Sequence, residues 1–255
     1  MVKPIALITG ASAGLGAEFA KQLAKKNYDL ILVARDKARL EALAASLPEA
    51  NCEVYPADLI KADELKRLEQ KLSSGAPLDL LVNNAGIGTF GPFYQLDIEK
   101  EEEEIRLNVV ALVRLTRAAL GPMVAIGKGA VLNVSSIAGF VPGPKNATYN
   151  ATKAYVSSFT EAIYEELQGT GVHAMALCPG FTRTEFQDRA QIDVSSIPSF
   201  AWMTAEKVVE EALYGLERRE LFCVPGSGYR AIVGAIGFSP RTLIRKVSGY
   251  ITRKL

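Results

Sequence analysis

Short apolar runs rich in β-branched residues recur along the chain, and each is followed by a longer segment with helical periodicity. The runs show no alternation of polar and apolar positions, which is typical of parallel strands covered on both faces. Strands are predicted at 5–9, 30–34, 52–56, 80–83, 130–135, 173–178 and 221–225. Helices are predicted at 14–26, 36–47, 61–72, 97–120, 149–167 and 204–216. This order predicts an α/β fold with a doubly wound, seven-stranded parallel sheet and helices on both faces.

The length of the chain, 255 residues with 49% hydrophobic content, is near the size at which one α/β domain stops growing. No Pro/Ser-rich linker, repeat or low-complexity tract interrupts it, so we expect a single domain over 1–255. Within that domain, 181–203 is expected to form a substrate loop and 226–255 a basic C-terminal extension. The acidic run EKEEEE at 99–104 is expected to form the solvated first turns of a helix, where carboxylates suit the positive end of the helix dipole.

The cysteines Cys52, Cys178 and Cys223 are widely separated, lie in apolar runs and form no CxxC pair. We therefore expect buried, reduced thiols and a cytoplasmic protein. The N-terminus enters a strand within five residues, too soon for a secretory signal, and no transmembrane helix is expected.

The formal charge of +1 gives no reason to expect nucleic acid as a partner, and the single histidine, His173, argues against most metal sites. The charge is unevenly distributed, however. After Glu220 there are six basic residues and no acid, whereas the first 220 residues hold 23 basic and 28 acidic side chains. This C-terminal segment is expected to be an amphipathic helix from Pro240 that contacts an anionic membrane surface or a charged acyl carrier, or a packed tail or oligomer contact.

A glycine-rich loop follows the first strand, with the sequence TGASAGLG at 9–16. Backbone without Cβ atoms can approach a pyrophosphate closely, and the helix behind the loop supplies free N–H donors and a positive potential. Between a first strand and a first helix, such a loop indicates dinucleotide binding by a Rossmann-type fold. The residues expected to contact the cofactor here are Gly10, Ser12, Gly14, Leu15 and Gly16.

The residues after the second strand indicate which dinucleotide binds. A carboxylate there would bind the ribose hydroxyl of NAD, but this chain has Ala34 followed by Arg35. A guanidinium suits bidentate binding of a phosphate, so NADP(H) is the expected cofactor. Asp36 has its simplest role as the N-cap of the next helix. After the third strand, the carboxylate of Asp58 is expected to bind the adenine amino group, although Asp58 also suits a plain turn, and Leu59 is expected to contact the cofactor.

Further motifs follow in order along the chain: NNAG at 83–86, a lone Asn108, NVSS at 133–136, YxxxK at 149–153, and PG at 179–180. Together with the glycine loop, this ordered set resembles the short-chain dehydrogenase/reductase family from about Lys3 to Val224, and looks most like its DltE-like subgroup. The resemblance implies that the catalytic residues are Asn108, Ser136, Tyr149 and Lys153. It also implies cofactor contacts from Asn84, Ala85, Gly86, Tyr149, Lys153, Pro179, Gly180, Thr182 and Thr184.

The chemistry of carbonyl reduction suits these residue types. The reaction needs a hydride donor, polarisation of the oxygen, and a proton for the alkoxide. A tyrosine has a pKa of about 10, which a nearby ammonium can lower. Lys153, one helical turn from Tyr149, is expected to do this and, by the resemblance, to reach the nicotinamide ribose. Ser136, which lies 13 residues before Tyr149, is expected to bind the substrate oxygen, and Asn108 to hold a water. Ser135 is then a packing or backbone-bonding residue.

Two segments are expected to shape the substrate site, 86–93 and 181–203. The second contains apolar side chains that either line the site or seal the loop against the core: Phe181, Phe186, Ile192, Val194, Ile197, Phe200, Trp202 and Met203. The sequence thus predicts an NADP(H)-dependent oxidoreductase that reduces a lipophilic ketone or aldehyde to an alcohol. The alternatives are an NAD-linked alcohol dehydrogenase for a small substrate and a non-catalytic dinucleotide-sensing protein. The family suggests a homodimer or homotetramer.

Overall fold

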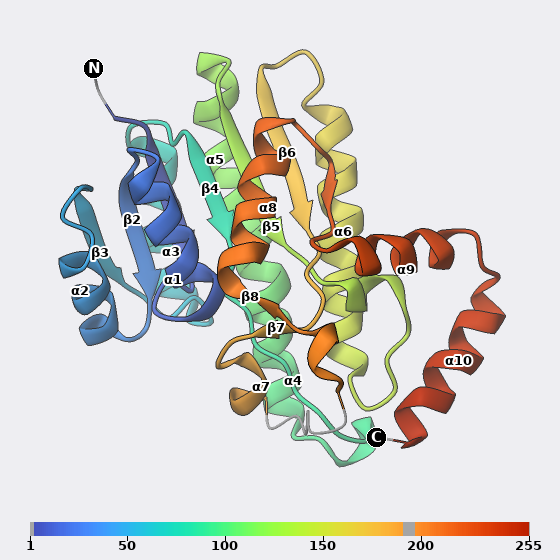
Figure 1. Cartoon of the computed structure of the whole chain (residues 1–255). Helices are drawn as coiled ribbons and strands as arrows, with labels where there is room; N and C mark the ends of the chain where they lie inside the picture. The colour runs from blue at the N-terminus through green and yellow to red at the C-terminus, as the bar shows by residue number, and fades with distance from the viewer. Residues whose placement is uncertain (1–2, 191–196, 255) are drawn as a thin grey trace.

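The computed structural model describes residues 3–190 and 197–254. Its centre is a parallel sheet of seven strands in the order β3-β2-β1-β4-β5-β6-β9, with helices on both faces (Figure 1). The predicted doubly wound fold is confirmed. The strand order reverses between β1 and β4, and in such sheets ligands bind beyond the carboxyl ends of the strands near this point.

The strands of this sheet are β1 Ile5–Thr9, β2 Asp29–Ala34, β3 Cys52–Pro56, β4 Leu80–Asn83, β5 Gly129–Val134, β6 Val172–Leu177 and β9 Phe222–Cys223. A small second sheet pairs β7 Thr182–Arg183 with β8 Met203–Thr204. The helices are α1 Gly14–Lys25, α2 Lys37–Ala45, α3 Ala62–Ser74, α4 Ile98–Ile105, α5 Leu112–Ile126, α6 Ala147–Glu166, α7 Phe186–Arg189, α8 Ala205–Glu217, α9 Ser227–Gly237 and α10 Arg241–Lys254.

The sheet separates two hydrophobic cores. Successive side chains of a strand point to opposite faces, so Leu7 of β1 packs with Leu68 of α3 and Leu115 of α5, while Ile8 packs with Phe19 of α1. Both faces are therefore apolar, which explains why the strand sequences show no polar alternation.

The helix predicted at 97–120 is a longer, irregular element. α4 continues through a π-helical segment, Arg106–Ala111, into α5, which ends at Ile126. By length and hydropathy alone, Ile98–Ile126 could cross a membrane. In the structure it instead packs on α3, α6 and the sheet, as a helix that covers a sheet does.

The prediction of a solvated acidic run on α4 is wrong for two of its residues. Glu101 is 2% exposed and Glu104 is 0% exposed. The spacing explains this burial, because residues 101, 104 and 108 lie three and four apart and share the helix face that packs against α6.

The C-terminal segment forms two helices, which Figure 1 shows in red on the right. α10 begins after Pro240, as predicted, but α9 was not predicted. α9 packs on the short 3-10 helix Ile137–Phe140, so it belongs to the body of the domain.

All three cysteines are unpaired. Cys178 and Cys223 are buried as expected, whereas Cys52 is only partly buried because β3 is the edge strand of the sheet.

Candidate active site

A pocket of about 1090 Å³ lies where β1 to β6 end. Most of the predicted site residues line it: Gly10, Ser12, Gly14, Leu15, Arg35, Asp58, Leu59, Asn84, Ala85, Gly86, Ser136, Tyr149, Lys153, Pro179, Gly180, Thr182 and Thr184. Gly16 and Asn108 do not line the pocket and lie behind its wall.

The glycine loop turns sharply in front of α1. Gly10 and Gly14 have φ of +66° and +55°, a region that side-chain-bearing residues rarely adopt. Gly16 is needed for another reason, because a Cβ there would lie 2.3 Å from the carbonyl oxygen of Gly10. The loop can therefore fold tightly over the start of α1 only with glycine at these positions.

The N-terminus of α1 has properties that suit an anion. Its N-cap, Ala13, provides no side-chain hydrogen bond, and its first turn contains no acid. The first amides of the helix are thus left without a side-chain cap, at the positive end of the helix dipole. This arrangement fits a diphosphate group.

Asn84 joins β4 to the glycine loop. Its Nδ2 donates to the carbonyl of Thr9 at 2.8 Å, and the Thr9 hydroxyl accepts from the amides of Asn84 and Ala85, both at 2.9 Å. The neighbouring Asn83 donates to Thr116 and Asn133 in the core. The NNAG motif therefore holds strand ends together as well as lining the pocket.

Two arginines lie near the end of β2, and only one of them is paired. Arg39 makes two contacts with Glu185, at 3.1 and 2.8 Å, and an ion pair with Asp36. Arg35 lines the pocket, is exposed, and forms no ion pair or hydrogen bond within the part of the chain that the structure describes. Asp36 also caps α2 by accepting from the Arg39 amide at 3.0 Å, as predicted.

The turn after β3 is held by both of its acids. Asp58 accepts from the amide of Ile60 at 3.1 Å, and Glu64 accepts from the amide of Asp58 at 2.7 Å. Asp58 is thus a turn residue and a lining residue of the pocket at the same time.

Tyr149 and Lys153 lie on the same face of α6 at the base of the pocket. The Lys153 ammonium donates to the carbonyl of Val134 at 2.8 Å and lies 5.6 Å from the centre of the Tyr149 ring. Burial lowers the pKa of Lys153 to about 8, opposed by the negative charge of Glu104. The ammonium is therefore tied to the end of β5, beside the phenol.

Burial raises the pKa of Tyr149 to about 12, against a hydrogen bond with Ser136 that lowers it, and Glu104 raises it further. The expectation that the pKa of Tyr149 is lowered is wrong for this structure. Burial of the phenol is the largest cause and raises this pKa, and the Lys153 ammonium is bonded to the carbonyl of Val134. Tyr149 accordingly keeps its proton at neutral pH.

The two serines after β5 have different surroundings. Ser136 accepts from the Ala138 amide at 3.1 Å and donates weakly to the Pro179 carbonyl at 3.4 Å, so its hydroxyl stays at the pocket surface. Ser135 donates to the carbonyl of Lys153 at 2.8 Å and is 2.8 Å from the hydroxyl of Ser157. Ser135 is thus the backbone-bonding residue, as predicted.

Asn108 lies in the π-helical segment, a distortion that often occurs at functional sites. Its Nδ2 donates to the Ile87 carbonyl at 2.9 Å and to Thr152 at 3.2 Å, and its Oδ1 accepts from the Ile87 amide at 3.0 Å. The side chain therefore fixes the 86–93 loop against α6. A role in holding a water stays a prediction.

The apolar residues of the substrate loop divide between the two expected roles, lining the site and packing elsewhere. Of its eight apolar side chains, only Phe181, Phe186 and Ile197 line the pocket, and Ile192 and Val194 lie outside the described residues. The others lie elsewhere: Trp202 packs on Phe181, Phe200 is exposed, and Met203 packs on the core.

Sequence reasoning missed the contribution of the C-terminal helices to the pocket. Ile232 and Ile236 of α9 line it, and so does Ser248 of α10, which donates to the carbonyl of Pro142. Tyr229 of α9 explains the glycine of the PG motif, because a Cβ at Gly180 would lie 2.2 Å from the Tyr229 ring. No local signal links these distant segments.

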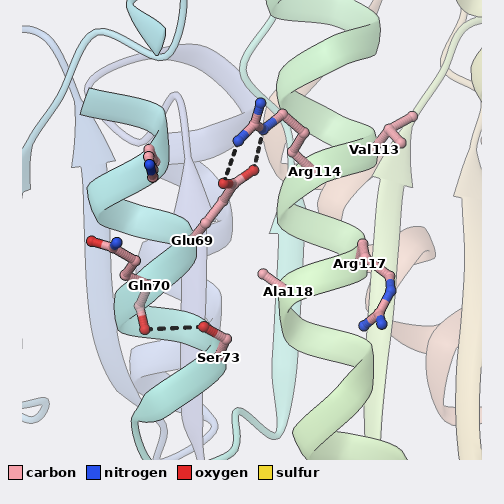
Figure 2. Close-up of a pocket in the computed structure, with 8 residues that line it drawn as sticks. Glu69, Gln70, Ser73, Val113, Arg114, Arg117 and Ala118 are labelled. Atoms are coloured by element: carbon pink, nitrogen blue, oxygen red, sulfur yellow. Dashed lines mark hydrogen bonds and ion pairs between the residues drawn. The ribbon is translucent and has the colours of Figure 1, made fainter. Parts of the chain in front are cut away.

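A second hollow of about 430 Å³ lies between α3 and α5, away from the predicted site residues. Figure 2 shows its main contact, a paired hydrogen bond between the guanidinium of Arg114 and the carboxylate of Glu69. It contains none of the residues that the sequence motifs identified, and we assign it no role.

Comparison with known proteins identifies the family. Residues 4–194 match the family model of the short chain dehydrogenases. The chain belongs to this family. It is therefore an oxidoreductase that acts on alcohol or carbonyl groups.

Several relatives are similar over most of the chain. A very-long-chain 3-oxoacyl-CoA reductase of Anas platyrhynchos is 29% identical over 229 residues, which are 86% of this chain and 72% of that protein. A ketoacyl reductase, HetN, of a Nostoc species is 32% identical over 211 residues, covering 81% of this chain and 72% of that protein.

Among solved structures, a short-chain dehydrogenase from Sphingobium yanoikuyae in complex with NADPH is 40% identical, with a TM-score of 0.85, and the match covers 91% of this chain and 93% of that one. A bulky-bulky ketone specific alcohol dehydrogenase from Comamonas testosteroni is 32% identical, with a TM-score of 0.79, over 93% and 95% of the two chains.

Proposed function

We propose that this short-chain dehydrogenase uses NADPH to reduce a large, apolar ketone or aldehyde to its alcohol. The observation that carries this proposal is the placement of Tyr149, a phenol that keeps its proton, between the glycine loop and an apolar pocket wall. A proton on this residue is what reduction requires, because the alkoxide that forms must be protonated.

The chain's own residues account for the acid–base part of the reaction. Ser136 and Tyr149 bind the carbonyl oxygen, and Tyr149 donates its proton as negative charge develops on that oxygen. Lys153, held near the ring by Val134, stabilises the phenolate that remains. Phe186 packs on Tyr149 with ring centres 5.5 Å apart and keeps water from this side of the phenol. The nicotinamide supplies the hydride when bound.

The choice of NADP(H) over NAD(H) rests on Arg35. The uncapped start of α1 suits the diphosphate of either dinucleotide, and the unpaired guanidinium of Arg35 suits the further phosphate on the ribose that only NADP(H) has. A relative at 40% identity has NADPH in its solved complex, which supports the same assignment.

The substrate class rests on the size of the pocket and its walls. Residues from three separate segments give it apolar surface: Ile87, Phe181, Phe186, Ile197, Ile232 and Ile236. A relative named for very-long-chain 3-oxoacyl-CoA and another named for bulky ketones support a large lipophilic carbonyl compound.

NADPH consumption, followed by absorbance across ketones and 3-oxoacyl thioesters of graded chain length, tests this function. The proposal predicts that kcat/KM rises with chain length and is higher with NADPH than with NADH. Faster turnover of small polar substrates with NADH would favour the NAD-linked alcohol dehydrogenase instead. Tight cofactor binding with no carbonyl consumed would favour a sensing protein.

The proposal extends to where the enzyme works: in the cytoplasm, as a homo-oligomer, with a peripheral contact to anionic lipid through α9 and α10. Phe238 between these helices and Leu243 and Val247 of α10 are exposed, basic residues lie near them, and no acid follows Glu220. Sedimentation with anionic vesicles at low salt, compared with neutral vesicles, tests the lipid contact. No sedimentation with either vesicle, or equal sedimentation with both, would contradict it.

A further inference from the structure

Two carboxyl groups are buried beside the catalytic residues, on the inner face of α4. Glu101 and Glu104 are almost fully buried, and each has one oxygen, Oε1, with no hydrogen-bond partner among the described residues. Burying a carboxylate without a cation bonded to it is costly, so this arrangement lowers stability. A pair retained at such a cost beside a catalytic site is a candidate for a functional role.

The other oxygens of the pair hold two segments that flank Tyr149. Oε2 of Glu104 accepts from the amide and the hydroxyl of Thr89, at 3.0 and 3.1 Å, and Thr89 belongs to the 86–93 loop of the pocket. Oε2 of Glu101 accepts from the hydroxyl of Thr148, the residue before Tyr149. One turn of α4 therefore connects the pocket loop to the start of α6.

The titratable groups around Glu104 come from two elements. Glu101 lies on its own helix, and Tyr149 and Lys153 lie on α6, which packs against α4; the loop contributes the neutral Thr89. A negative charge on Glu104 raises the pKa of Tyr149 and also that of Lys153. Burial, with a further contribution from Glu101, raises the pKa of Glu104 to about 7.

We propose that Glu104, beside Glu101, is a positioning residue that holds a proton: its charge, present once that proton is lost to solvent, keeps the proton on Tyr149, so that oxidation of the alcohol, which needs the phenolate, begins at higher pH. The inference rests on the proposed function, because it takes Tyr149 as the acid. Glu104 exchanges its proton with solvent only, and no bond to substrate or cofactor forms at this residue.

The pH dependence of alcohol oxidation tests the pair, since oxidation requires Tyr149 without its proton. In Glu104→Gln the amide oxygen can still accept from Thr89, but the charge is gone. The midpoint of the oxidation profile is expected to move to lower pH by roughly half a unit to one unit, because the phenolate no longer faces a like charge. Reduction is expected to fall off at correspondingly lower pH.

Two further variants separate this effect from a structural one. Glu102→Gln makes the same chemical change on the same helix, at an exposed residue that pairs with Arg106 at 2.6 Å. It is expected to leave the pH profile of oxidation unchanged. Glu101→Gln keeps the ionisation of Glu104 but is expected to move it to lower pH, because a like charge is removed. Profiles of Glu104→Gln and Glu102→Gln that coincide with the wild type would overturn the proposal.

Two measurements test the pair without turnover, so its failure can be told apart from failure of the proposed function. The infrared carbonyl band of a protonated carboxyl is expected in wild type at neutral pH, absent in Glu104→Gln and retained in Glu102→Gln. The ultraviolet absorbance of ionised tyrosine, titrated in the wild type and in Tyr149→Phe, gives by difference the pH at which Tyr149 ionises. The same difference measured with Glu104→Gln present in both proteins should have its midpoint at lower pH. Absence of the band, or an unmoved midpoint, would overturn the proposal even if carbonyl reduction is observed.

Discussion

The cofactor side of the pocket and the C-terminal side differ in how tightly their backbones are constrained. In the glycine loop, a Cβ at Gly16 would lie 2.3 Å from a backbone oxygen. In α9, a Cβ at Gly234 or Gly237 meets nothing within 4 Å, and the adjoining Phe238 is 96% exposed. A tightly constrained backbone requires glycine at fixed positions, and these positions can be recognised in a single sequence. An apolar wall can be formed by many different residues, so it leaves no fixed pattern in the sequence.

Gly16→Ala is the variant expected to have the largest effect on the cofactor side. The new methyl group would lie 2.3 Å from the Gly10 carbonyl and 2.6 Å from Nδ2 of Asn84, so the loop backbone has to shift. We expect a loss of about 3 kcal/mol in the free energy of unfolding, with weakened dinucleotide binding. Denaturant unfolding and a fluorescence titration with NADPH measure both. Unchanged values would show that the loop is less constrained than its geometry indicates.

Glu104 sharpens the same comparison on the catalytic side, through the pH dependence of stability. Its pKa in the folded state, about 7, lies above its ordinary value of 4.5, so the folded protein binds the proton more tightly than the unfolded chain. The contribution of Glu104 to the free energy of unfolding should therefore be full below about pH 4.5 and fall as the pH rises to about 7, by up to about 3 kcal/mol.

In Glu104→Gln, this fall over the same pH interval should be much smaller than in wild type and in Glu102→Gln. Thermal unfolding at a series of pH values makes the comparison. Identical pH dependence in the three proteins would show that Glu104 does not hold a proton in the folded state.

Arg35 lies on the cofactor side and forms no ion pair or hydrogen bond with the described residues, so the effect of changing it should be specific to one ligand. Arg35→Ala is expected to weaken NADPH binding by roughly tenfold to a hundredfold, because a charged hydrogen bond to phosphate is lost, and to leave NADH binding unchanged. Arg67→Ala is a matched control, since Arg67 lies outside the pocket and pairs with Asp63. An equal loss of affinity for NADPH and NADH would show that Arg35 supports the structure of the pocket and does not bind the extra phosphate.

Gly234→Ala gives the smallest expected effect, and one of opposite sign to Gly16→Ala. Gly234 lies within α9, and an added methyl group meets no atom there. Helix propensity favours alanine by about 1 kcal/mol, so the variant should be slightly more stable, with NADPH binding unchanged. A loss of stability would mean that α9 is packed more closely than the structure shows.

Features set by local constraints could be predicted from the sequence. The strands follow from their apolar runs, the N-cap role of Asp36 from its position before α2, and the role of Ser135 from alternation at the end of β5. Asp36 acts on the backbone of the helix that follows it, and alternation at the end of a single strand distinguishes Ser135 from Ser136, so one sequence contains the information.

Features that depend on distant packing could not be predicted in this way. The acidic run on α4 concealed the three-and-four spacing that buries Glu101 and Glu104 with Asn108. The pKa of Tyr149 depends on burial, which the YxxxK motif does not encode. Ile232 lines the pocket only because of where α9 packs, and the sequence does not show that position.

The central claim is that Tyr149 is the acid of carbonyl reduction, and single-turnover oxidation of bound NADPH in Tyr149→Phe tests it most directly. Tyr155→Phe is the matched control, because Tyr155 lies on the same helix and is 45% exposed. The account predicts that Tyr149→Phe binds NADPH normally but reacts at least about a hundredfold more slowly, while Tyr155→Phe reacts like the wild type. Equal rates in all three proteins would contradict it.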